Sequence, residues 1–410
     1  MSKPGDPHRS WDYAAALAPP GRLDSSMPAL PVFPLLAVAL CAPLAAQTVW
    51  TVDRLNGAGT NFTDLPAAVQ AAAPGDVLQV RYHDPLQVAP YTAPTITKAL
   101  TVVGVGGRPG LVGDLRVQNL APGQRVVLRE LRLAPFAGAS TPGSCHLRIL
   151  GNQGTVHLQY VTRQTTPQSS AAANAWIVDG NRLVEFEFCS FDMVGATGTL
   201  QIRDTNAVHA TSCAFQSLGP ATATLLAVTN TRVVLAETLV LGPPTVGVLP
   251  IDQCNGELRL AGSNTSVLAP SGGLSIGSAC GGTVRVGSGA FLGQTSGVTL
   301  SNEPVPALGG AITPSQVLRM SMFGESLGIG LIVVGDPLPA PVPLFGGDLW
   351  LDPTAAGILQ VVALDLSGRG NWQLPLTAPL PTGTSAWLQG TTLGLATGFL
   401  LTPPVVVTGP

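Results

Sequence analysis

Apolar residues recur in pairs, two positions apart, on both sides of a short polar corner between residues 115 and 286. The period of two is that of a β-strand with one face toward a core. The corners hold Asn, Gly or Asp, which tolerate left-handed backbone. The first members of the copies are separated by 32, 29, 24, 25, 24 and 25 residues and are Leu115, Leu147, Trp176, Leu200, Leu225, Leu249 and Leu274.

One strand, a corner and a second strand cannot enclose a core, so each copy must stack on its neighbours. Stacking at the strand spacing of about 4.8 Å predicts an all-β fold, a right-handed parallel β-helix over residues 47–295. A helical solenoid is excluded because the 3.6-residue period is missing. Leucine-rich repeats are excluded because their fixed Leu and Asn consensus is absent.

The segment before the repeat predicts a short helix over Leu65–Ala73, begun by Asp64 or Thr63 with Pro66 in its first turn. Such a helix would cover the exposed edge of the first coil. Strands are expected after it at Val77–Val80, Thr95–Ile96 and Leu100–Val105.

The repeat pattern ends near residue 295. Residues 296–314 are rich in Pro and Gly and are interpreted as a linker. Residues 315–410 then show strands about ten residues apart, which is typical of a small antiparallel β-sandwich. Attachment, export sorting and capping of the open solenoid end are alternative roles for this domain. The expected strands are Leu327–Val334, Gly347–Leu351, Gly357–Leu364, Gly370–Leu376, Thr384–Gln389 and Phe399–Val407.

Residues 1–46 are interpreted as a polar leader and a signal peptide. An apolar run follows Met27 and ends in small residues, which indicates cleavage near Ala46-Gln47. Met1 and Met27 are alternative start sites. We therefore expect a secreted or cell-surface protein with no membrane span in the mature chain.

Composition supports an extracellular β-architecture. The 410 residues include 48 Gly and 37 Pro, and only 10% are charged. The net charge of −3 and the lack of a basic cluster argue against nucleic acid as a partner.

The opening of the expected mature chain resembles a known family. The run FTDLPAAVQAAAPGDVLQV, then Tyr91, then ITKALTVVGVG is similar to the start of secreted bacterial right-handed parallel β-helix proteins of the pectin-lyase-like superfamily. The similarity covers residues 48 to about 135. It implies a β-helix and export. The superfamily includes polysaccharide lyases and hydrolases as well as members with no assigned activity.

Weak catalytic candidates are Arg203, Glu185, Glu187 and Asp204. Lyases of the superfamily use an arginine base and carboxylates that hold calcium, so calcium is expected only under that alternative. The 24-residue step instead places Asp179 beside Arg203 and Glu185 beside His209, which we interpret as solvated contacts between coils. The three acids form the best set for a hydrolase. No cofactor and no metal-ligand spacing is found.

Cysteines one coil apart are disulfide candidates in an exported chain. Cys254 and Cys280, both at corners, favour a disulfide. For Cys189 and Cys213 a disulfide and a pair of buried thiols remain open, because parallel strands in register fit disulfide geometry poorly.

Exposed aromatic residues can form sugar-binding surfaces. Core packing is the better interpretation for the residues around the first cysteine pair, Trp176, Phe186, Phe188, Phe191 and Phe215. The outward candidates, Tyr82, Tyr91 and Tyr160, are scattered. The sequence thus favours a non-catalytic β-helix protein that presents an elongated face to carbohydrate or other surface components. A polysaccharide lyase or glycoside hydrolase acting on an acidic polysaccharide is the alternative, and the oligomeric state is open.

Overall fold

The computed structural model describes residues 47–409 except for a set of short segments. The expected leader and signal peptide lie outside the described residues. The segments left out are 85–86, 134–144, 164–174, 193–198, 218–223, 246–247, 271, 314, 345–346 and 377–384.

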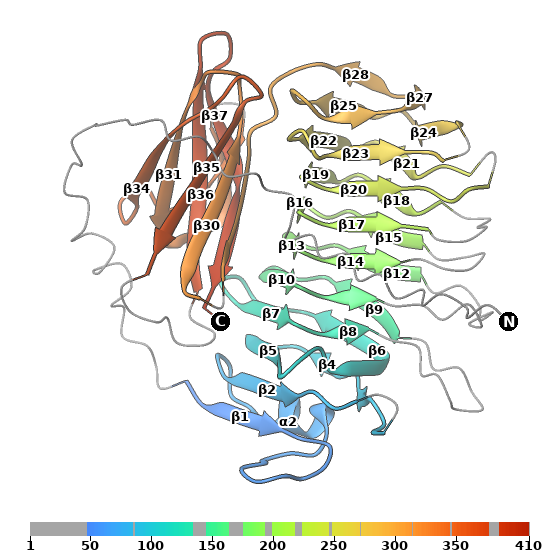
Figure 1. Ribbon diagram of the computed structural model, residues 1–410, viewed down its shortest axis with the longest axis vertical. Coiled ribbons are helices and arrows are strands. Elements are labelled where there is room, and N and C mark those ends of the chain that lie inside the picture. The colour runs from blue at the N-terminus through green and yellow to red at the C-terminus, as the bar shows by residue number, and fades with distance from the viewer. Residues whose placement is uncertain are drawn as a thin grey trace, which may run out of the picture.

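Three parallel sheets form an elongated β-helix, which confirms the predicted solenoid (Figure 1). Sheet A has one strand from each successive coil. Its strands are β1 (Val49–Val52), β2 (Val77–Arg81), β5 (Leu100–Val105), β7 (Arg125–Arg129), β10 (Thr155–Gln159), β13 (Leu183–Glu187), β16 (Ala207–Thr211), β19 (Arg232–Ala236), β22 (Glu257–Ala261), β25 (Thr283–Val286) and β28 (Thr299–Ser301).

Sheets B and C share the long strand β6 (Gly110–Gln118), which joins them into one 17-stranded sheet. Sheet B also contains β3 (Tyr91–Thr92), β8 (Arg132–Leu133), β11 (Thr162–Arg163), β14 (Ser190–Asp192), β17 (Ala214–Gln216), β20 (Leu239–Leu241), β23 (Ser266–Leu268) and β26 (Phe291–Leu292). Sheet C also contains β4 (Thr95–Ile96), β9 (Cys145–Leu150), β12 (Ala175–Asp179), β15 (Thr199–Arg203), β18 (Leu226–Thr229), β21 (Ile251–Cys254), β24 (Leu274–Gly277) and β27 (Gln294–Ser296).

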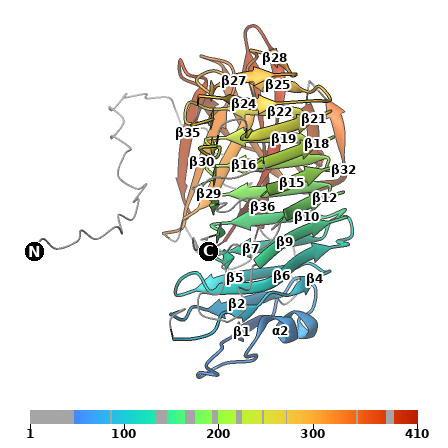
Figure 2. The ribbon, with the colours of Figure 1, turned by 90° about the vertical axis from the view of Figure 1, so that its right-hand side faces the viewer.

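In the repeated coils the chain passes from sheet C through a tight corner to sheet A and then to sheet B. Figure 2 shows the successive strands stacked along the long axis. Asp179 pairs with Arg203 in register, and Glu185 pairs with His209, as the 24-residue step predicted. The parallel register therefore converts sequence periodicity into spatial neighbours.

The predicted inward positions are wrong by one residue in the coil of β18, and Leu274, also predicted to face inward, is 37% exposed. Leu226 and Val228, not Leu225 and Ala227, continue the inward column of Leu200. The step from Leu200 to Leu226 is 26 residues, one more than the step between Val208 and Val233. An extra residue before β18 therefore reverses which side chains face the core.

Large side chains fill the solenoid interior around the first cysteine rungs. Trp176 packs edge-on to Phe191 with ring centroids 4.8 Å apart, and Phe191 lies 5.4 Å from Phe215. These residues and Phe186 are at most 2% exposed, so their core interpretation is confirmed.

A polar ladder lines the corner between sheets C and A. Asn152 Nδ2 donates to Asn181 Oδ1 at 2.7 Å, and Asn181 Nδ2 donates to the Ile149 carbonyl at 2.8 Å. Thr205 and Thr231 continue the ladder with hydroxyls that accept from buried backbone N–H groups. Because each corner amide is satisfied, the sharp turn is compatible with burial.

The N-terminal helix α2 (Leu65–Ala71) is two residues shorter than expected. Asp64 accepts from the Leu65 backbone N–H, and Pro66 lies in the first turn. Leu65 and Ala68 join the solenoid core. The helix lies beside β1 and β2 at the N-terminal end of the solenoid (Figure 1).

The C-terminal strands form antiparallel sheets that share a hydrophobic core, as expected for a small sandwich. The three-stranded sheet has β29 (Ala307–Ile312), β30 (Val317–Phe323) and β35 (Arg369–Pro375). The four-stranded sheet has β34 (Gly357–Ala363), β31 (Ile329–Gly335), β36 (Ser385–Gly394) and β37 (Gly398–Thr408), and a separate hairpin has β32 (Pro337–Leu344) and β33 (Gly347–Leu351).

This domain lies alongside sheet A rather than over the open end of the solenoid (Figure 1). The capping role considered for it is therefore wrong. The segment 296–314, expected as a linker, contains β28 of the solenoid and β29 of the antiparallel domain.

Candidate functional site

The outer face of sheet A is the place where the two parts of the chain meet. Arg129 Nη1 donates to the Gly409 carbonyl at 2.9 Å, and Arg182 Nη2 donates to the Leu338 carbonyl at 2.7 Å. Arg232 forms an ion pair with Asp348 at 2.6 Å. These contacts run along several coils, so the C-terminal domain covers sheet A over much of its length.

An apolar cluster completes this contact. Leu183 and Ala207 project outward from sheet A and are buried with Trp350, while Trp387 packs against the same cluster. The Arg182 guanidinium lies 5.2 Å from the centre of the Trp350 ring. A cation over an aromatic face adds to the burial of the apolar surface.

Two of the catalytic candidates, Glu185 and Glu187, are buried beneath the C-terminal domain. They are 5% and 4% exposed. Burial raises the pKa of Glu185 to about 8, opposed by Arg125 and by a hydrogen bond from the Val406 backbone. Burial also raises the pKa of Glu187 well above its usual range. Both groups therefore favour the neutral acid.

Glu187 ends a chain of hydrogen bonds. Gln159 Nε2 donates to Glu187 Oε2 at 2.8 Å, and His157 Nε2 lies 3.2 Å from the same oxygen. Arg125 Nη2 is 2.8 Å from His157 Nδ1. Burial lowers the pKa of His157 well below its usual range, so a neutral ring accepts from Arg125 and donates to Glu187. Glu187 Oε1 and Gln159 Oε1 are buried without a hydrogen-bond partner among the described residues. The group lies on the covered face of sheet A and is shielded from solvent.

His209, the neighbour of Glu185, is also covered. Its ring donates to the Pro404 carbonyl, and burial lowers its pKa to about 3. The interpretation of Glu185 and His209 as solvated neighbours is wrong, because the C-terminal domain excludes water from this rung.

The other two candidates lie at the end of sheet C. Arg203 Nη2 pairs with Asp179 Oδ2 at 2.9 Å, and these side chains are 44% and 33% exposed. Asp204 occupies the following corner and accepts from Asn230 Nδ2 at 2.8 Å. The four candidates thus belong to two environments, one covered and one open, and do not form a common catalytic group.

Only one of the two candidate cysteine pairs forms a disulfide. Cys254 and Cys280 form a disulfide, which confirms that prediction. Cys189 and Cys213 are buried free thiols, so the disulfide alternative for this pair is wrong. Burial raises the pKa of the Cys213 thiol, which makes it an unreactive core residue.

The border between sheets A and B carries a feature that the sequence analysis missed. In five successive coils one residue turns this corner with a positive φ of 49–53°. The rings of Tyr160 and Phe188 are stacked there, 4.9 Å apart and 8° from parallel. From the N-terminal side the corner residues are Glu130, Tyr160, Phe188, Ser212 and Glu237.

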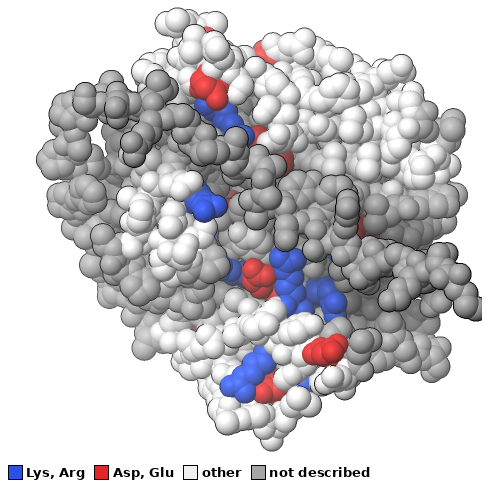
Figure 3. All heavy atoms as spheres, in the orientation of Figure 1, with Lys and Arg blue, Asp and Glu red and all other residues white. Residues whose placement is uncertain are grey.

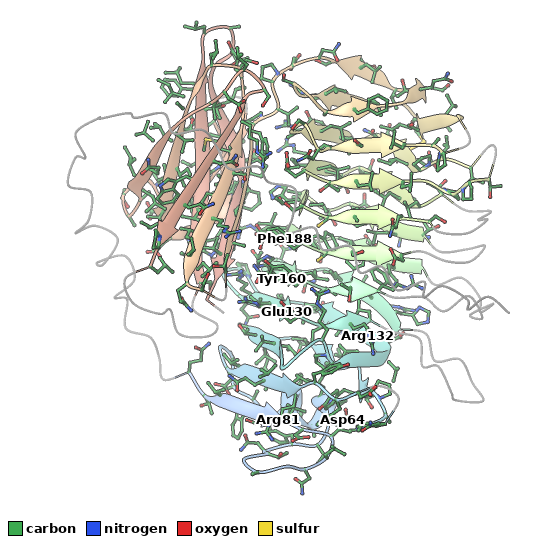
Figure 4. The ribbon with its side chains drawn as sticks, in the orientation of Figure 1. Asp64, Arg81, Glu130, Arg132, Tyr160 and Phe188 are labelled. Atoms are coloured by element: carbon green, nitrogen blue, oxygen red, sulfur yellow. A yellow bond between two sulfur atoms is a disulfide. The ribbon has the colours of Figure 1, made fainter. Side chains whose placement is uncertain are left out.

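Phe188 is 36% exposed, so its assignment to the core is wrong. Figure 4 shows Glu130, Tyr160 and Phe188 one above another at the edge of the solenoid that lies next to the C-terminal domain. Tyr91, expected to point outward, is buried, and its hydroxyl donates to the Arg81 carbonyl at 2.8 Å. The sequence contained a signal for the Tyr160–Phe188 stack. These residues are 28 positions apart, the same step that separates the paired residues Gln159 and Glu187.

Charge is sparse on the open face of the solenoid. In Figure 3 uncharged atoms cover most of the upper right of the molecule. Charged side chains are seen at the upper left and in the lower centre, where basic and acidic groups lie next to each other. Arg108 and Glu130 form one such pair at 3.0 Å. Among the described residues no cluster of three or more His, Cys, Asp or Glu is placed to hold a metal ion.

The described part of the chain contains no helix of the length and hydropathy needed to cross a membrane. The sequence matches no protein-family model and no curated protein.

Proposed function

We propose that this chain is a non-catalytic, exported β-helix protein that binds carbohydrate on the open face of sheet B and on its border with sheet A. Membership of the pectin-lyase-like superfamily, with a signal peptide in residues 1–46, is part of this proposal. The similarity of residues 48 to about 135 supports it. The Cys254–Cys280 disulfide supports export, because disulfides persist in oxidising compartments.

The proposal rests on one observation: one face of the solenoid is covered and another is exposed. The C-terminal domain covers the outer face of sheet A, and with it Glu185 and Glu187. The open border of sheet B instead presents the Tyr160–Phe188 stack. Exposed aromatic faces beside short polar side chains are suited to the apolar and hydroxylated surfaces of a sugar.

The enzyme alternative has no such support. A retaining or inverting hydrolase needs two carboxyl groups on opposite sides of a sugar, whereas Glu185 and Glu187 lie on one strand and are buried beneath the C-terminal domain. A lyase base at Arg203 would have to leave its ion pair with Asp179. We therefore propose that residues 315–410 serve to cover sheet A and leave sheet B as the binding face.

Affinity electrophoresis of the purified protein in gels containing soluble polysaccharides tests this function. Retardation by at least one polysaccharide, with no new ultraviolet absorbance on incubation with uronate polymers, is the expected result. An absence of retardation by every polymer would overturn the proposal. Lyase activity that disappears in Arg203→Ala would overturn it as well.

A further inference from the structure

The strongest unassigned feature is the pair of bulky aromatic residues in left-handed backbone. Tyr160 has a φ of 53° and Phe188 a φ of 49°. For residues other than Gly and Asn this conformation costs about 1–2 kcal/mol each. The corner between sheets C and A meets the same demand with Asn119, Asn230 and Asn255.

The aromatic stack ends at Phe188 on its C-terminal side. Residue 212 follows Phe188 on the next rung, because Glu187 pairs with Thr211 and Ser190 pairs with Ala214. The Phe188 backbone N–H also donates to the Thr211 carbonyl at 3.0 Å. Ser212 is too small to cover a ring, so the Phe188 face away from Tyr160 has no aromatic neighbour among the corner residues.

The rungs around this face carry hydrogen-bonding groups. Ser212 supplies a hydroxyl on the next rung, and Glu237 stands one rung beyond it. Glu237 accepts from Asn264 and lies 3.6 Å from Arg369. A flat ring placed at the level of Ser212 would continue the stack and meet polar groups at its rim.

We infer that the free face of Phe188, bordered by Ser212, is a stacking subsite for one pyranose ring of a neutral polysaccharide. This inference rests on the proposed carbohydrate-binding function and assigns its position and ligand class. The apolar C–H face of a pyranose packs against the electron-rich ring face, while its hydroxyls reach Ser212 and the neighbouring rung of Glu237.

Charge favours a neutral sugar over a uronate. The charged corner residues two rungs away on both sides of Phe188 are carboxylates, Glu130 and Glu237, so the corner itself offers no counter-ion to an acidic unit. The arginines beside them, Arg108 and Arg369, already pair with these carboxylates. Arg132 stands on the Glu130 rung, two rungs from the subsite.

Two substitutions separate binding from stability. Phe188→Asn removes the ring and places at this corner a residue that accepts left-handed backbone, so the protein should remain at least as stable. Ser212→Tyr puts a second ring on Phe188 and occupies the subsite. Both should weaken binding at least about tenfold, which is the loss expected for one stacked ring.

Two variants serve as controls. Phe188→Tyr keeps a ring face at the corner and should keep binding. Phe291→Ala removes an aromatic side chain that is 56% exposed at the far end of sheet B, and it should leave binding unchanged.

The experiment is affinity electrophoresis of the full chain in xyloglucan and in polygalacturonate, with thermal unfolding of each variant. The inference is supported if the parent binds xyloglucan and Phe188→Asn and Ser212→Tyr lose binding without a lower melting temperature. If the parent binds and Phe188→Asn binds equally well, the subsite is wrong while the proposed function stands. Stronger binding to polygalacturonate overturns the ligand class, and an absence of all binding overturns both proposals.

Discussion

Pairs of ionisable residues on two outer faces of the same solenoid differ in their exposure to water. On sheet C, Arg203 and Asp179 pair on neighbouring rungs and remain partly exposed. On sheet A, Glu185 and His209 occupy the equivalent relation but are buried by the C-terminal domain. The sequence pattern is the same, so the covering domain alone decides whether a charged pair is a weak surface contact or a neutral buried pair.

The largest expected effect comes from opening the covered face. Trp350→Ala removes a 2% exposed side chain from the cluster with Leu183 and Ala207, and it should lower the free energy of unfolding by about 3–5 kcal/mol. Urea denaturation followed by fluorescence measures the loss. Leu366→Ala, at a side chain that is 78% exposed, is the matched control and should change stability by less than about 0.5 kcal/mol. Equal effects of the two changes would contradict the assigned interface.

The second largest effect is expected from the disulfide at the corner between sheets C and A. Replacing both Cys254 and Cys280 by Ser opens a link between residues 26 apart and should cost about 2–4 kcal/mol. A reducing agent should lower the melting temperature of the parent and leave that of the double variant unchanged. Cys189→Ala retains the disulfide, so its melting temperature should still respond to the reducing agent. If it no longer does, the assigned pairing is wrong.

The stability of the protein should depend on pH through four buried groups on the covered face. The pKa of Glu185 is raised to about 8 from 4.5, so between these values the folded state holds a proton that the unfolded state lacks, and stability falls as pH rises. The pKa of His209 is lowered to about 3 from 6.5, so stability falls as pH decreases through that window. Glu187 and His157 act in the same directions as Glu185 and His209.

Stability should therefore be greatest between about pH 4.5 and 6.5, where the two effects oppose each other, and each group changes it by at most about 1.4 kcal/mol per pH unit outside that range. Glu185→Gln should flatten the decline between pH 6.5 and 8 in urea titrations. A curve parallel to that of the parent would show that Glu185 does not titrate in this interface.

The smallest effect is expected on sheet C. Arg203→Ala leaves Asp179 accessible to water, so it should cost less than about 1 kcal/mol and less still at high salt. Asp179→Asn is the complementary variant, and the double variant gives the coupling energy. A loss comparable to that of Trp350→Ala would mean that the two faces do not differ as described.

Some of the candidate site was accessible from the sequence. The 24-residue step identified Arg203 as the neighbour of Asp179 and His209 as the neighbour of Glu185. It did not identify the exposed aromatic stack, because Phe188 lies between the buried Phe186 and Phe191 and resembles them in type. Only the corner backbone, with its positive φ, turns this ring outward.

By itself the sequence determined the local and periodic features of this protein. The alternation of apolar residues and the Asn and Gly corners specify strands and turns, and stacking follows because one coil cannot bury its own core. The tertiary structure decided which outer face is covered. Arg182 meets a partner 156 residues away, and Arg129 meets one 280 residues away. Contacts at such separations depend on how two folded surfaces fit, and no short-range pattern in the chain encodes that fit.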